Sequence, residues 1–107
     1  MTRPSIKSLR EQHYVVTRIG QQLNRLLNAV KSEDYDTAEN VGKEIWRLTE
    51  QHQNLHTVSL LSADVWGCIP PYVFFSPKSD REQCIREVIT KVSFTQKTLH
   101  YVIEGWS

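Results

Sequence analysis

Four histidines are the residues whose type and spacing come nearest to a metal site. His52 and His56 lie four positions apart, which places two imidazoles on one helix face, a spacing that zinc sites use. His13 falls level with His52 if residues 4–55 form an antiparallel helical hairpin, so that three imidazoles would converge, with His100 a more distant fourth. However, the residues after His52 do not form an HExxH motif. We therefore interpret these histidines as groups that hydrogen-bond locally and fix the hairpin register, and we assign no metal and no cofactor.

The two cysteines are the candidate nucleophiles. Cys68 and Cys84 lack CxxC spacing, and residues 1–10 lack the apolar stretch of a secretory signal, so we expect reduced thiols in a cytoplasmic protein. Cys84 falls in the first turn of a predicted helix, where the helix dipole is expected to lower the pKa of a thiol. Neither cysteine has a recognisable catalytic neighbour, and the four glycines are isolated rather than grouped in a phosphate-binding loop. The sequence therefore predicts a protein that is not an enzyme.

Basic residues concentrate in the first third of the chain. Residues 1–32 carry six Lys or Arg side chains against one glutamate, whereas residues 33–56 carry six Asp or Glu side chains against Lys43 and Arg47. The first interpretation is that two helical arms attract each other along their flanks, although each exposed pair contributes only about 0–1 kcal/mol. The alternative is that the outer face of the first helix binds nucleic-acid phosphates. The residues for this alternative are Lys7, Arg10, Arg18, Arg25 and Lys31.

Length and composition predict one helical domain that spans residues 1–107. Hydrophobic residues make up 39% of the chain and charged residues 23%, which is ordinary globular usage and argues against disorder. The net charge of +1 creates no global field that would attract nucleic acid or a membrane surface. The longest nearly uncharged stretch, residues 51–76, contains two histidines, Gly67 and a Pro-Pro pair. We therefore expect no membrane-spanning segment.

The elements that must position these groups are organised around the hairpin of residues 4–55. Apolar residues recur at helical spacing over residues 6–30 and again over residues 38–55. The polar turn between the two arms offers Ser32 or Asp34 as the N-cap of the second helix. Because the turn is short, the arms must be antiparallel neighbours. The predicted fold is thus all-α, a long antiparallel hairpin plus a C-terminal helix in a bundle of three to four helices.

The hairpin register pairs each mid-helix glycine with large residues on the other arm. Gly20 is expected to face Ile45 and Trp46, and Gly42 is expected to face Leu23. A small residue opposite a large one is what interdigitating layers need. Because a mid-helix glycine costs about 1 kcal/mol relative to alanine, close approach of a bulky partner is a reasonable compensation.

Helix ends beyond the turn are less sharply defined by the sequence. Thr2 or Ser5 is the expected N-cap of the first helix, with Pro4 tolerated in its first turn. The second helix either continues past Leu55 to Trp66 or breaks near residues 56–59, where β-branched and hydroxyl residues are weak helix formers.

The C-terminal helix opens with a predicted capping box. Ser79 is the expected cap, and Glu82 follows three residues later. The apolar seam of this helix consists of Ile85, Val88, Val92, Thr95, Leu99, Val102 and Trp106.

The connector between the hairpin and the C-terminal helix is the best candidate site. Its prolines exclude a helix and favour extended conformation at Ile69, Pro70 and Ser76. Part of this apolar segment must cap the bundle, and the rest forms a candidate recognition surface, because aromatic groups held by prolines lose little entropy on binding. The candidate partner-binding residues are Trp66, Ile69, Pro70, Pro71, Tyr72, Phe74 and Phe75.

These patterns together predict a small non-enzymatic protein-binding module of the adaptor, inhibitor or export-chaperone type. The partner would be another protein that contacts the connector and the exposed stripes of the long helices. A homodimer formed through a second apolar helix stripe is a further alternative. Nucleic-acid binding through the basic face of the first helix is the competing function.

Overall fold

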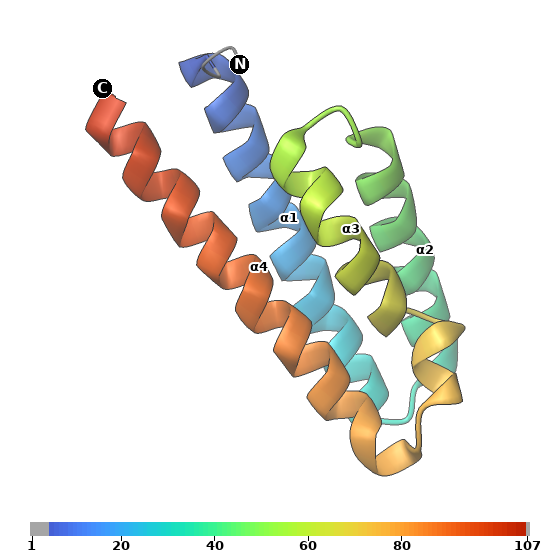
Figure 1. Ribbon diagram of the computed structural model, residues 1–107. Coiled ribbons are helices and arrows are strands. Elements are labelled where there is room, and N and C mark those ends of the chain that lie inside the picture. Colours follow the sequence, from blue (N-terminus) through green and yellow to red (C-terminus); the bar gives the residue numbers. More distant parts are fainter. Residues whose placement is uncertain (1–4, 107) are drawn as a thin grey trace.

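The computed structural model describes residues 5–106, which form four α-helices and one short 3-10 helix (Figure 1). The α-helices are α1 (Ile6–Lys31), α2 (Tyr35–Gln51), α3 (His56–Cys68) and α4 (Lys78–Trp106), and the 3-10 helix η1 (Tyr72–Phe75) precedes α4. The prediction of an all-α bundle built on a long antiparallel hairpin and a C-terminal helix is confirmed. No helix in residues 5–106 is long and apolar enough to cross a membrane.

Successive helices run in opposite directions, so the start of α1 and the end of α4 lie at the same end of the bundle (Figure 1). Helix α1 packs against α2 and most extensively against α4, while α3 contacts all three of the other helices. Because α1 is central, its apolar residues are buried on more than one side. The largest fully buried side chains include Ile19, Leu23, Leu26, Ile45, Val58, Val73 and Ile85.

The hairpin turn forms where the sequence predicts it. Helix α1 is capped at its start by Ser5, whose Oγ accepts from the Ser8 N–H at 3.1 Å, whereas Thr2 and Pro4 lie outside the described residues. At its end, the N–H groups of Glu33 and Asp34 donate to the carbonyls of Val30 and Ala29, the Schellman pattern, with Glu33 at a φ of 56°.

Asp34 then caps α2 as predicted. Its carboxylate accepts from the Thr37 hydroxyl at 2.7 Å and from the Thr37 N–H at 3.2 Å. These hydrogen bonds to the charged form lower the pKa of Asp34. The same short turn thus ends α1 and caps α2, which explains why the two arms are antiparallel neighbours.

The hairpin's second helix ends earlier than either predicted possibility. Helix α2 stops at Gln51, and α3 begins at His56, so the break lies at residues 52–55. Gln53 stabilises the break, because its side-chain amide donates to the Thr49 carbonyl at 2.9 Å and to the Ser62 hydroxyl at 2.5 Å. The N-cap position of α3, Leu55, makes no side-chain hydrogen bond to the helix. Gln12 of α1 takes this role, since its side-chain oxygen accepts from the Thr57 N–H at 3.1 Å.

The connector and the start of α4 also differ from expectation. Ile69 and Ser76 are extended as predicted, but between them residues 72–75 form one 3-10 turn, so the prediction that prolines exclude any helix is wrong for this segment. Helix α4 begins at Lys78, which places Ser79 inside the first turn. The predicted Ser79 cap is therefore wrong, and its hydroxyl instead lies 3.5 Å from the carboxylate of Asp80.

The predicted glycine register is wrong for both mid-helix glycines. A Cβ at Gly20 would meet Val92 of α4 at 3.5 Å, and a Cβ at Gly42 would meet the Pro70 ring at 2.8 Å. The predicted register considered only the two arms of the hairpin. In the structure, α4 packs against the helix face that carries Gly20, and the connector packs against the face that carries Gly42. The C-terminal seam is buried at Ile85, Val88, Val92 and Leu99. Thr95 and Val102 are half-buried, and the Trp106 side chain lies outside the described side chains.

Candidate functional site

A groove of about 490 Å³ lies between the outer side of α2 and the connector. Helix α2 contributes Gly42, Lys43, Trp46, Arg47 and Glu50 to its lining, and the connector contributes Ile69, Pro70, Pro71 and Tyr72. We call this the aromatic groove. It brings together four of the seven predicted partner-binding residues with side chains of α2 that the sequence analysis did not select.

Trp46 forms one wall of the aromatic groove and is held there by a second tryptophan. The rings of Trp46 and Trp66 lie 4.6 Å apart between centroids. The Trp66 indole N–H donates to the Thr49 hydroxyl at 2.7 Å, and that hydroxyl lies 3.1 Å from the Ile45 carbonyl, which anchors the pair to the backbone of α2. Trp66 therefore supports the groove from behind, while Trp46 remains 42% exposed.

Gly42 lets the connector approach α2 closely. Because a Cβ at this position would lie only 2.8 Å from Pro70 Cδ, the proline ring packs directly against the helix. Ile69, the connector residue before Pro70, is buried, and Val73 within η1 is fully buried. The groove is thus bounded by a helix and by a connector that is anchored in the core.

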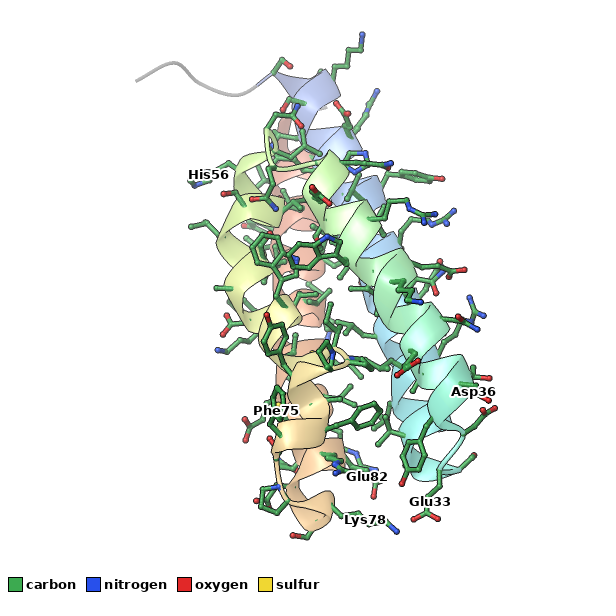
Figure 2. All side chains as sticks on the ribbon, turned by 90° about the vertical axis from the view of Figure 1, so that its right-hand side faces the viewer. Glu33, Asp36, His56, Phe75, Lys78 and Glu82 are labelled. Carbon is green, nitrogen blue, oxygen red and sulfur yellow. The ribbon has the colours of Figure 1, made fainter. Side chains whose placement is uncertain are left out.

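The other connector residues divide into anchored and exposed side chains. Phe74 is half-buried, with its ring edge-on to Tyr35 at 5.4 Å and beneath the Arg81 guanidinium at 5.2 Å. Phe75 is 79% exposed and points away from the bundle (Figure 2). Tyr72 is 55% exposed and lies 6.3 Å from the Phe75 ring. The predicted partner-binding residues therefore include both buried and exposed side chains. This division agrees with the expectation that part of the connector caps the bundle and the rest forms a surface.

A second groove of about 480 Å³ lies on the opposite flank of α2, against α1. Two residues of the nucleic-acid alternative, Arg18 and Arg25, line it together with Arg47, and Arg25 lies 3.5 Å from the Glu44 carboxylate. We call this the basic groove. The other three residues of that alternative, Lys7, Arg10 and Lys31, are exposed but do not line it.

The predicted convergence of histidines does not occur. His52 is the C-cap of α2 and His56 is the first residue of α3, so the assumption that they share one helix face is wrong. Figure 2 shows His56 pointing outward at the start of α3. His13 contacts His100 of α4, with 5.8 Å between ring centroids, and His52 Nδ1 lies 2.8 Å from the Leu48 carbonyl, the local bond that the structural interpretation expects. Residues 5–106 contain no group of three or more His, Cys, Asp or Glu side chains arranged to hold a metal ion.

The pKa of both cysteine thiols is raised above its ordinary value. Burial raises the pKa of the Cys68 thiol to about 12, and the thiol lies 3.3 Å from the Val65 carbonyl. The expectation that the helix dipole lowers the pKa of Cys84 is wrong in direction, because burial and then the charge of Glu87 raise it. Both cysteines are free thiols.

Sequence reasoning missed the five residues that α2 contributes to the aromatic groove, which are Gly42, Lys43, Trp46, Arg47 and Glu50. The hairpin register had placed Trp46 opposite Gly20 of the first arm. The available signal was its helical phase: Lys43 and Arg47 are four apart, and Trp46 lies three positions after Lys43 on that same outer face. What the sequence could not show is that the connector folds back against this face.

Comparison with protein-family models, with curated proteins and with solved structures found no match to this chain.

Proposed function

We propose that the protein is a small non-enzymatic protein-binding module, of the adaptor, inhibitor or export-chaperone type, which binds its partner in the aromatic groove. The observation that carries the proposal is the groove itself, where the half-exposed rings of Trp46 and Tyr72 flank Pro70 and Pro71. Exposed aromatic groups around a concave apolar surface are typical of protein-binding hot spots.

The rigidity of the groove supports the proposal. Trp46 is braced by Trp66, and Pro70 is packed against Gly42. The end of the connector is held by Arg81, whose guanidinium donates to the Phe74 carbonyl at 3.1 Å and to the Ser76 carbonyl at 3.2 Å. Side chains that are already fixed lose little conformational entropy when a partner binds, so more of the contact energy appears as affinity.

The test is capture of the partner by immobilised protein from its native host, analysed by mass spectrometry. We expect Tyr72→Ala to lose a partner that the wild type retains, and Phe75→Ala to weaken its capture, since the Phe75 ring lies 6.3 Å from Tyr72 just outside the groove lining. Helical circular dichroism should be unchanged, because both side chains are exposed. The matched controls are Tyr101→Ala and Phe94→Ala on α4, which remove rings of the same kind that are 80% and 73% exposed, and these variants should retain the partner. If Tyr72→Ala unfolds the protein, or if all four variants capture the same partner, the assignment of this groove is wrong.

Nucleic-acid binding is the second candidate because the basic groove joins Arg18, Arg25 and Arg47. Guanidinium groups from two helices bind phosphate oxygens well. Glu44 lines the same groove and already pairs with Arg25, which weakens this candidate.

A further inference from the structure

The aromatic groove and the basic groove meet at one residue. Arg47 lines both of them, so they form one surface that passes over α2 from the connector to α1. Lys43 lies one turn before Arg47 on the same helix, and Arg18 faces Arg47 from α1. Lys43 and Arg47 thus line the aromatic groove itself, and Arg18 continues the row of cations into the basic groove.

Within the part of the chain that the structure describes, these three cations have no partner. Among residues 5–106, Arg18, Lys43 and Arg47 make no ion pair and no side-chain hydrogen bond. Arg25, in contrast, is engaged by Glu44 at 3.5 Å and by Gln22 at 3.0 Å. The surface therefore presents positive charge that the fold itself does not use.

From this complementarity we propose that the partner segment is an acidic peptide, with an apolar side chain in the aromatic groove and carboxylates bound by Arg18, Lys43 and Arg47. The inference rests on the proposed function and specifies the chemistry of its partner. A guanidinium matches a carboxylate in a two-bonded fork, and a partner charge desolvated beside an apolar groove binds more strongly than at an open surface.

A peptide fits this surface better than a nucleic-acid strand does. A strand carries a phosphate at every nucleotide and would pass Glu50 in the aromatic groove and Glu44 in the basic groove. A peptide places single carboxylates opposite single cations and leaves apolar residues for Pro70 and Tyr72. We therefore treat RNA binding as an outcome that the test must be able to detect.

The experiment selects phage-displayed random peptides against the full-length protein and measures synthetic copies of the enriched peptides by fluorescence anisotropy. We expect enriched sequences to combine an aromatic residue or proline with nearby Asp or Glu. Arg47→Glu and Lys43→Glu should each weaken peptide binding about tenfold or more. Peptides with Asn and Gln in place of Asp and Glu should bind the wild-type protein more weakly by a similar factor. The matched control Lys97→Glu, an exposed cation on α4, should change the affinity by less than about twofold.

The outcomes separate this inference from the function on which it rests. Peptides that bind in a Tyr72-dependent manner, without acidic residues and without loss in Arg47→Glu, would overturn the acidic partner but leave the protein-binding module in place. If no enriched peptide is weakened by Tyr72→Ala, both are wrong. If single-stranded RNA displaces the peptides and Arg47→Glu abolishes RNA binding, the surface is a nucleic-acid site instead. Circular dichroism of each variant checks that the fold is retained.

Discussion

Gly42 is the residue on which the shape of the candidate site depends most directly. It brings the Pro70 ring within contact of the α2 backbone, and this contact sets one end of the aromatic groove. Gly20 is also in the middle of a helix, but the nearest atom to its Cβ position is a Val92 methyl at an ordinary 3.5 Å. Both glycines lower helix stability relative to alanine, but only Gly42 is required by the close approach of a neighbouring residue.

Gly42→Ala and Gly20→Ala should therefore change stability in opposite directions. Overpacking against a proline ring costs about 1–3 kcal/mol, more than the gain of about 1 kcal/mol from replacing a helical glycine with alanine. We expect Gly42→Ala to lower the free energy of unfolding, by up to about 2 kcal/mol, and Gly20→Ala to raise it by about 0.5–1 kcal/mol. Urea denaturation measures both. Equal stabilisation by the two substitutions would show that the connector does not pack against Gly42.

At the scale of the elements, the short helix α3 depends on a residue of α1. Its N-cap position, Leu55, has no side-chain acceptor, and the side-chain oxygen of Gln12 instead accepts from both the N–H and the hydroxyl of Thr57, at 3.1 and 2.8 Å. Gln12 is buried, with 4% of its surface exposed. A cap donated from another helix couples the position of α3 to that of α1, and through α3 to the connector.

Gln12→Ala should destabilise the protein by about 1–3 kcal/mol, because it leaves the partly buried N–H and hydroxyl of Thr57 without their acceptor. The free energy of unfolding from urea titration measures the loss, and amide hydrogen exchange at Thr57 should accelerate more than at residues in the middle of α1. Gln21→Ala, at an exposed position on α1, is the control and should stay within about 0.5 kcal/mol of the wild type. Equal effects of the two substitutions would contradict the capping role of Gln12.

Over the whole molecule, positive and negative charges nearly cancel, but they are unevenly distributed over the surface. The net charge is +1, yet Arg18, Lys43 and Arg47, which have no ion-pair partner among the described residues, all line the two grooves that meet at Arg47. Three of the other basic residues of α1 do not extend this cluster, since Lys7, Arg10 and Lys31 lie outside the basic groove. The surface can therefore oppose a few discrete anionic groups rather than a long phosphate backbone.

Single-stranded RNA should consequently bind weakly. With about three phosphate contacts, we expect a slope of about −2 for the logarithm of the association constant against the logarithm of salt concentration, and no measurable binding at physiological salt. Fluorescence anisotropy with labelled oligonucleotides checks this expectation. Tight binding at physiological salt with a much steeper slope, reduced by Lys7→Gln and Arg10→Gln, would instead support the nucleic-acid alternative.

Local patterns in the sequence were sufficient for much of the fold. The apolar spacing over residues 6–30, the Asp34 cap and the polar turn predict the hairpin because each acts through neighbours a few positions away in the chain. The same reasoning located the connector as an apolar, proline-bearing segment. It misplaced the start of α4, because it took Ser79 as the N-cap, whereas the helix already begins at Lys78.

The sequence by itself determined that the chain forms a helical hairpin, a C-terminal helix and an apolar connector between them, since periodicity and capping are local properties. Only the tertiary structure decided which surfaces meet. It set Pro70 against Gly42, paired His13 with His100, and joined Trp46 and Arg47 to the connector in one groove. The physical reason is that these contacts link helix faces distant in the chain, and their register depends on the packing of all four helices at once.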